Sequence, residues 1–301
     1  MSKRISPPDL EAANILLSEL FEEVNKWESQ LAGGIKLPVG ATAVQRLRQS
    51  EISFGNPRNK LIFLTEEAFK EAGVELTPIY RKQMRGEYDF YYMSVTVNLR
   101  PQPGAQFRWL SCQLDFSPKG KSEPIVQAIF PQSEWRTVME WGVGMSLGLN
   151  ENLNWSVGVD ATQETELANL YGNWKANIAS KNKLKGLIVV PEFTYEAGRS
   201  EITAVGEGGS TCDWYIQDAE MLKKTTVEFA TVFKVPQGTE SIKLRGIAWA
   251  EANMNWFTAN LGDVFGELDD RFKNLLQQKD KAARQLARGI SEEWSLALPK
   301  T

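Results

Sequence analysis

The sequence predicts an α+β fold dominated by strands, with antiparallel, sandwich-like sheets flanked by amphipathic helices near the N- and C-terminal ends. Three observations support this prediction. Apolar residues recur at helical spacing mainly near the two ends of the chain, and they alternate at strand spacing through much of its middle. The strand-like runs are separated by short turns that contain proline and glycine rather than by long helices, which favours antiparallel pairing.

A first helix is expected between Ser6 and the glycine pair at Gly33 and Gly34. Ser6 suits the cap, Pro7 and Pro8 suit the first turn, and the two glycines end the helix. Its apolar residues follow steps of three and four: Leu10, Ala13, Leu17, Leu20, Val24, Trp27 and Leu31. A narrow apolar seam of this kind is typical of a helix that faces another helix.

A second amphipathic helix is expected near the C-terminal end. It repeats the same stepping at Leu261, Phe265, Leu268, Phe272 and Leu275. Two interpretations are open: the two seams cover the chain's own core, or they are offered to a partner. In the second case the contact residues are Leu17, Leu20, Val24, Trp27, Leu268, Phe272 and Leu275.

Extended segments fill much of the chain between these helices. They comprise residues 91–99, 106–116, 124–130, 186–196, 200–205, 225–235 and 241–250. The turns "PQPG" (101–104) and "PQGTE" (236–240) each lead from one strand to the next, which hints at a duplicated unit. Shorter helices are expected at 65–72, 133–141 and 167–178.

No linker divides the chain. Stretches rich in glycine, serine or proline are absent from the sequence, so residues 1–301 are expected to form one strand-rich domain. The most plausible internal boundary is at 181–185.

The composition argues against several kinds of chemistry. The 301 residues include no histidine, and the net charge is −4. Without histidine the chain has no Ser-His-Asp triad, no Cys-His dyad and no His-ligated metal. The negative net charge gives no electrostatic footprint for nucleic acid. We therefore expect no catalytic residue set, no cofactor, no metal site and no nucleic-acid partner.

Cys112 and Cys212 each lie in a strand-like segment. Two cysteines are too few for a disulfide framework, and we expect apolar core thiols in a reducing compartment, with a single disulfide as the alternative. The first residues show no secretory signal, and no apolar run has the length of a membrane-spanning helix. A cytoplasmic location is expected.

The segment "WGVGMSLGLNENLNWSVGVDA" (141–161) has the pattern of a two-stranded hairpin. Its apolar face comprises eight side chains, Val143, Met145, Leu147, Leu149, Leu153, Trp155, Val157 and Val159. Glycine, serine and asparagine form the other face, and Glu151 at the tip is the only charged residue between Trp141 and Val159. Burying eight such side chains contributes roughly 12–24 kcal/mol before opposing costs. Something must therefore cover this face.

Three coverings are open for residues 141–161. The hairpin packs in the interior, with its small-residue face close to another element. Alternatively, it pairs with a strand of another chain. As a third alternative, it enters a membrane after oligomerisation, because open sheet edges are not tolerated in hydrocarbon. Its arms are about seven to nine residues long, and a spanning strand needs about nine to eleven.

Three weaker patterns have simpler explanations. Ten tryptophans could include a platform for sugars, with Trp256 and Phe257 the first pair to test, but tryptophans in strands are usually packing residues. The loop "GEGGST" (206–211) could bind an anion, but it lacks the lysine of a phosphate-binding loop. Glu192 and Glu196 are expected about 13 Å apart on one strand face, too far for paired catalytic carboxylates.

These observations lead to one expected function and several alternatives. We expect a non-catalytic cytoplasmic protein that presents a strand edge or helix seam to another protein or to copies of itself. The alternative is an oligomerising, membrane-inserting protein of the pore-forming type that uses the 141–161 hairpin. Further alternatives are a carboxylate-dependent hydrolase and a tryptophan-mediated glycan binder.

Overall fold

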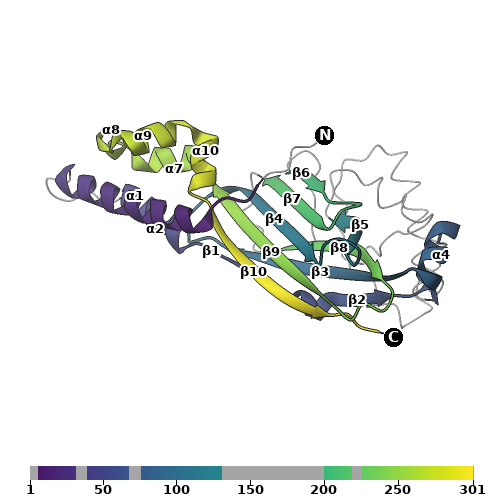
Figure 1. Cartoon of the computed structure of the whole chain (residues 1–301). Helices are drawn as coiled ribbons and strands as arrows, with labels where there is room; N and C mark the ends of the chain where they lie inside the picture. Colours follow the sequence, from purple (N-terminus) through teal and green to yellow (C-terminus); the bar gives the residue numbers. More distant parts are fainter. Residues whose placement is uncertain (1–5, 32–38, 68–75, 131–199, 219–225, 301) are drawn as a thin grey trace, which may run out of the picture.

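The alternating and helical patterns of the sequence produce two stacked sheets with a helical bundle at one end (Figure 1). The computed structural model describes residues 6–31, 39–67, 76–130, 200–218 and 226–300. The molecule is elongated over these residues, and helix α4 (Pro78–Gly86) lies at the end opposite the bundle (Figure 1). The predicted α+β class, with antiparallel sheets flanked by helices from both ends of the chain, is confirmed.

The first sheet is built around two long central strands. β3 (Tyr88–Arg100) pairs with β8 (Thr226–Pro236), and β5 (Ile125–Phe130) lies on the far side of β8. On the other side, the short strands β1 (Glu51–Phe54) and β2 (Leu61–Leu64) pair with different ends of β3. All of these pairings are antiparallel.

The second sheet has five strands in antiparallel order. Their order across the sheet is β10 (Arg288–Ala297), β9 (Ser241–Ala252), β4 (Phe107–Ser117), β7 (Thr211–Asp218) and β6 (Ser200–Val205). β9 and β4 form its centre, and β6 is an edge strand on the same side of the molecule as β5.

Aromatic side chains from both sheets meet in the interior. Phe233 of β8 packs against Phe116 of β4 with ring centroids 4.9 Å apart, and against Tyr91 of β3 at 5.6 Å. Trp214 of β7 packs against Phe229 of β8 at 5.1 Å. Because period-2 alternation sends every second side chain inward, these strands bury a continuous apolar face between the sheets.

The two proline- and glycine-containing turns have equivalent roles. One connects β3 to β4, the other connects β8 to β9, and each carries the chain from the first sheet to the second. β3 pairs with β8 and β4 pairs with β9, so the two units lie side by side. Gly104 and Gly238 have φ of 85° and 84°, a conformation that glycine adopts without strain.

Helices from both ends of the chain form the bundle. They are α1 (Leu10–Leu31), α2 (Val39–Gln49), α7 (Met254–Leu261), α8 (Val264–Glu267), α9 (Asp270–Gln277) and α10 (Lys279–Gln285). The predicted C-terminal helix is interrupted. Gly262 ends α7 with φ of 50°, and the Asp269 carboxylate accepts the Arg271 N–H to begin α9.

Several predicted elements lie outside the described residues. They are the helices at 133–141 and 167–178, the strand at 186–196, the boundary at 181–185 and the hairpin at 141–161. Most of the expected helix at 65–72 also lies there. The sequence patterns did not predict α2, α4, β1, β2, β7 or β10, nor α7 apart from its last residue, Leu261.

Both cysteines are buried in the interior between the sheets, and they do not form a disulfide. Burial raises the pKa of the Cys112 thiol well above its usual value, and the nearby Cys212 and Asp213 add to this effect. Cys212 Sγ lies 4.0 Å from the Thr231 hydroxyl. The expectation of apolar core thiols is confirmed, and the alternative of a disulfide is wrong.

The apolar seams of the terminal helices face the chain's own core. Leu17, Leu20 and Val24 are each 0% exposed, and Trp27 is half-buried against the same cluster. The C-terminal residues Leu268, Phe272 and Leu275 are between 1% and 8% exposed. In this fold a partner can reach these side chains only if the helices separate.

The buried seam predicts a large effect of substitution within α1. Leu20→Ala should lower the free energy of unfolding by about 2–5 kcal/mol, because it leaves a cavity in the bundle. Ile15→Ala on the opposite face, where the side chain is 55% exposed, should change it by less than about 0.5 kcal/mol. Urea denaturation measures both, and equal effects would contradict the burial of this seam.

Candidate functional site at the edge between β5 and β6

The segment that contains the expected hairpin is attached at one edge of the sandwich. β5 ends at Phe130 and β6 begins at Ser200, and residues 131–199 connect them. Among the described strands, β5 is the last of the first sheet and β6 is the last of the second, and they contact each other. The hairpin residues Val143 to Val159 lie outside the described residues, but both points of attachment are described.

A group of polar side chains holds the two sheets together at this edge. Lys119 Nζ donates to Asp115 Oδ1 at 2.6 Å and to Ser210 Oγ at 2.5 Å. The Ser210 hydroxyl donates to Glu123, and the Thr211 hydroxyl donates to Asp115 at 2.8 Å. We call these five residues the corner clamp. It joins the end of β4, the turn before β5, and the turn between β6 and β7.

Backbone hydrogen bonds reinforce the corner clamp. Gly208 N donates to Val126 O, and Val126 N donates to Gly209 O, both at 2.8 Å. Phe116 N donates to Ser210 O at 2.8 Å. The turn of the second sheet is therefore bonded directly to β5 of the first sheet and to β4.

The glycines of "GEGGST" serve this close packing. Gly206 and Gly208 have φ of 155° and 78°. A Cβ atom on Gly206 would lie 2.6 Å from Thr211 O, which is too close for any side chain. The N–H groups of Gly208 and Gly209 already donate to backbone carbonyls. The loop is thus a hairpin turn, as its simpler interpretation predicts, and these two N–H groups are not free for an anion.

The electrostatics of the clamp keep Glu123 ionised. The Ser210 hydroxyl lowers the pKa of Glu123, and the Gly120 N–H and the Lys119 ammonium lower it further. The side chains of Lys119, Asp115 and Glu123 are between 34% and 48% exposed, whereas Ser210 is 6% exposed. Ser210 is therefore the buried centre of a partly solvated network.

At the opposite edge of the sandwich, strand β10 is protected against pairing with another chain. The Arg58 guanidinium donates to the Ser295 carbonyl on β10 at 3.0 and 2.7 Å, so this edge acceptor is occupied. Glu292 and Glu293 follow each other on the same strand. Charged residues and occupied backbone groups on an edge strand disfavour pairing with another chain. The edge at β5 and β6 is thus the better candidate for a functional contact.

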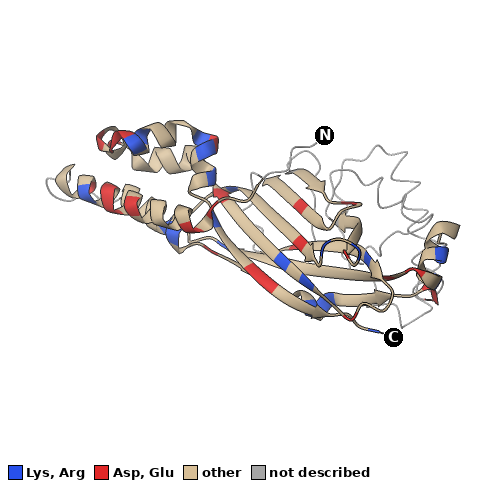
Figure 2. Ribbon diagram, in the orientation of Figure 1, with Lys and Arg blue, Asp and Glu red and all other residues tan. Residues whose placement is uncertain are grey.

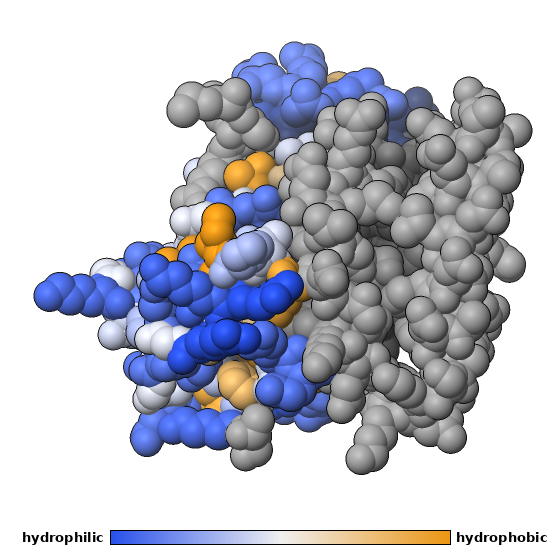
Figure 3. All heavy atoms as spheres, turned by 90° about the vertical axis from the view of Figure 1, so that its right-hand side faces the viewer, coloured by the Kyte–Doolittle hydropathy of each residue, from blue (hydrophilic) through white to orange (hydrophobic). Residues whose placement is uncertain are grey.

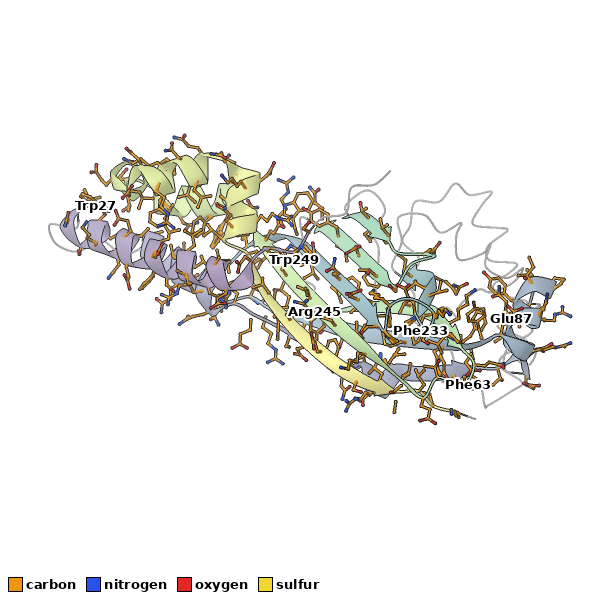
Figure 4. The ribbon with its side chains drawn as sticks, in the orientation of Figure 1. Trp27, Phe63, Glu87, Phe233, Arg245 and Trp249 are labelled. Atoms are coloured by element: carbon orange, nitrogen blue, oxygen red, sulfur yellow. The ribbon has the colours of Figure 1, made fainter. Side chains whose placement is uncertain are left out.

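A second polar group lies where the second sheet meets the helical bundle. Trp249 Nε1 donates to Glu251 Oε1 at 3.1 Å, and both side chains are at most 5% exposed. On neighbouring strands, Trp109 stacks on Tyr215 with centroids 4.8 Å apart. Figure 4 shows Trp249 at this junction. Burial raises the pKa of Glu251, and the Trp249 N–H opposes this shift.

The chemistry of this junction favours a structural role. A carboxyl group with a raised pKa can act as a general acid or base, but substrate must reach it, and Glu251 is 5% exposed. In the part of the chain that the structure describes, no group of three or more Cys, Asp or Glu residues could hold a metal ion. Glu192 and Glu196 lie outside this part.

Four of the described tryptophans are packing residues. Trp214 and Trp249 are buried, and Trp256 and Trp294 pack partly buried against the core. Trp256 and Phe257 contact each other with centroids 6.1 Å apart in α7, where Phe257 is 0% exposed. None of these side chains offers an open platform for a sugar.

Within residues 6–300, leaving aside the undescribed gaps, no helix is long and apolar enough to cross a membrane.

The comparisons with known proteins find no family and only weak structural similarity. No protein-family model matches the chain, and no curated protein matches its sequence. A structure described as a pore forming protein is 4% identical, with 67% of this chain and 78% of that chain covered, at a TM-score of 0.32. Clostridium perfringens delta-toxin is 9% identical with the same coverage and a TM-score of 0.26. The S. aureus collagen adhesin is 8% identical with 55% and 38% covered, at 0.21. Scores this low support no inference about function.

The corner clamp predicts that Ser210→Ala is destabilising. The substitution removes the hydroxyl that bridges Lys119 and Glu123 and should cost about 1–2 kcal/mol of unfolding free energy. Ser291→Ala, on the exposed edge strand β10, is the matched control and should have no measurable effect. Chemical denaturation monitors both variants, and a neutral Ser210→Ala would show that the clamp does not stabilise the fold.

The raised pKa of Glu251 predicts that replacing this residue with glutamine increases stability in a pH-dependent way. A carboxyl group whose folded pKa is raised contributes stability at low pH that is lost as the pH rises through that pKa. Glu251→Gln keeps an oxygen for the Trp249 N–H and removes the buried charge. It should raise the melting temperature at neutral and mildly alkaline pH, with little change at acidic pH. The exposed Glu293→Gln is the control. A Glu251→Gln variant that melts lower at alkaline pH would contradict the desolvation cost.

Proposed function

We propose that the protein is non-catalytic and assembles with copies of itself, and that the assembled copies insert their 141–161 hairpins into a membrane as one shared β-barrel. One observation carries this proposal. The segment 131–199 begins and ends at adjacent described strands, and the pairings among the described strands lie in residues 51–130 and 200–297. These described pairings do not involve the segment, so they can persist while it moves.

The hairpin sequence fits the chemistry of a barrel wall. Alternating apolar and small polar residues suit strands that face lipid on one side and a lumen on the other. One hairpin cannot span a bilayer alone, because its edge N–H and C=O groups would lack partners. Several copies that pair edge to edge remove those edges, so that membrane insertion requires self-assembly.

The energetics favour insertion once copies meet. Eight apolar side chains per hairpin contribute roughly 12–24 kcal/mol on leaving water. The one carboxylate that must cross, Glu151, costs about 3 kcal/mol by insertion scales. For a hairpin whose apolar face leaves water on insertion, apolar burial therefore exceeds the cost of the charge several-fold.

The corner clamp would keep the two sheets folded while the hairpin inserts. A protein that extends a segment must keep the rest of its fold while the segment moves. The clamp bonds the beginning of β5 and the turn after β6, so both strands stay anchored at one end while their other ends lead into 131–199. The expected cytoplasmic location is part of this proposal, so the bilayer would be reached from its cytoplasmic side.

Dye release from liposomes tests the proposal. The wild-type protein should release a trapped dye, with a rate that rises more steeply than linearly with protein concentration. Leu147→Lys places a charge on the lipid-facing side, at about 2–4 kcal/mol per copy, and should reduce the rate by at least about 30-fold. Ser146→Lys places the same charge on the opposite face and should retain release within about threefold.

Three results would decide against insertion. They are the absence of release at every protein concentration, equal loss in both lysine variants, and unchanged release by Leu147→Lys. Each variant is first checked by its melting temperature, so that loss of the folded body is not mistaken for loss of insertion.

A second candidate is a soluble assembly held by strand pairing at the β5 and β6 edge. The protected edge at β10 favours it, because the Arg58 guanidinium occupies a backbone acceptor there and disfavours strand pairing on that side. Light scattering separates the two candidates: a stable oligomer without liposomes and without dye release supports the soluble assembly.

A further inference from the structure

Helix α4 presents an unusual face at the end of the molecule opposite the helical bundle (Figure 1). Thr77 caps it by accepting the Tyr80 N–H, and Pro78 occupies its first turn. Its inner side is held by Tyr80, whose ring lies edge-on to Phe90 with centroids 6.0 Å apart, and by Met84, which packs on the same cluster. The rest of the helix faces outward.

The outward-facing residues of α4 include one exposed apolar side chain and two cations. Ile79 is 68% exposed, the largest fraction among the exposed large hydrophobic side chains of the described residues. Arg81 and Lys82 lie two and three positions further along the helix and are exposed. An open hollow of about 550 Å³ is lined by Pro78, Arg81, Lys82, Arg85, Gly86 and Glu87.

The charges on this face are only partly paired, and Glu87 is the one carboxylate that lines the hollow with the three cations. Glu66 pairs with Arg85 at 2.7 and 2.9 Å, so these two charges offset each other. Arg81 donates its Nε to the Leu76 carbonyl, a neutral group. Among the described residues, no carboxylate lies within ion-pair distance of Arg81 or Lys82. Figure 2 shows basic residues on α4 at this end of the molecule.

The face is held rigidly on the sandwich. Lys234 of β8 donates to Gln83 Oε1 at 3.1 Å, and the Gln237 side chain donates to the Met84 carbonyl at 3.1 Å. The Gln237 N–H donates to the Glu87 carbonyl at 3.1 Å, where α4 ends (Glu87 is labelled in Figure 4). A rigid support keeps the apolar residue and the cations exposed together.

We propose that the outward face of α4 docks on a bilayer surface that contains anionic phospholipid. This inference rests on the proposed function and adds the lipid class that it meets first. Cations at a bilayer surface attract anionic headgroups, and an exposed isoleucine can enter the boundary between headgroups and acyl chains. Seen end-on, the described surface carries mainly hydrophilic residues with hydrophobic ones exposed singly among them (Figure 3).

The size of the face favours a membrane over a protein partner. One exposed isoleucine and two cations cover far less than the roughly 800 Å² per partner of a stable protein interface. A membrane contact can be weak in each copy, because an assembly multiplies it through many linked copies. The cytoplasmic leaflet is the anionic one, which agrees with the expected location.

Flotation of the full-length protein with vesicles tests the proposal. The protein should float with vesicles of equal parts phosphatidylcholine and phosphatidylserine and remain behind with phosphatidylcholine alone. Arg81→Gln combined with Lys82→Gln should weaken binding about 25-fold, at about fivefold for each cation. Lys26→Gln combined with Lys281→Gln removes two exposed cations from the opposite end and should bind like the wild type. Ile79→Ser, with its charge unchanged, should also weaken binding.

Several outcomes would overturn the docking face. They are the absence of binding to either vesicle, equal weakening by both double variants, and displacement by inorganic phosphate at an ionic strength matched with chloride. The last result would assign the hollow to a free phosphate ion. Protein that binds through α4 without releasing dye supports docking and contradicts membrane insertion. If the wild type and the Arg81→Gln, Lys82→Gln double variant release dye at the same rate, this result contradicts docking through α4 but does not contradict membrane insertion.

Discussion

The aromatic contact between the two sheets is the interaction on which the rest of the structure depends. Phe233 contacts Phe116 across the interior, and Trp214 contacts Phe229 in the same layer. These rings come from β4, β7 and β8, and none comes from an edge strand. Because the main apolar burial lies between inner strands, the edge strands contribute less to the stability of the body. The edge at β5 and β6 can therefore carry a long connection without weakening the centre.

The sequence predicted the strands whose alternation is regular and missed those in which polar residues interrupt it. β3, β4, β8 and β9 alternate over long runs, and their predicted bounds agree with the structure within a few residues. In β10 only Ile290, Trp294 and Leu296 carry the apolar side, and two glutamates stand between them. β7 does alternate, with Cys212, Trp214 and Ile216 inward, but the glycine-rich turn before it obscured its start. The helical seams identified most of the buried faces correctly, but Leu31 at the end of the predicted N-terminal seam is 47% exposed. Spacing alone does not say which surface covers a seam.

The corner clamp could not be predicted, because its partners are distant in sequence and chemically ordinary. Asp115 and Thr211 become neighbours only through the register of β4 and β7, and Ser210 meets Lys119 only because a turn of one sheet reaches β5 of the other. Each of these side chains, taken alone, is typical of a solvated surface. The only feature of the sequence that pointed to the clamp was the density of glycine in "GEGGST". It indicated a tight turn but not which residues the turn would contact.

Lys234 connects helix α4 to strand β5 at this end of the sandwich. Its backbone is in register with Ile125, the first residue of β5, and its ammonium donates to Gln83 of α4 and lies 4.5 Å from the Tyr88 ring centroid. Burial lowers the pKa of this lysine, so its place between the helix and the strand carries a desolvation cost that the Gln83 and Tyr88 contacts offset. A force on α4 from a bound surface would thus act on the strand that leads into residues 131–199. The connection from α4 to β5 consists of the Lys234 side chain and the pairing of β8 with β5. It requires no rearrangement of the aromatic interior.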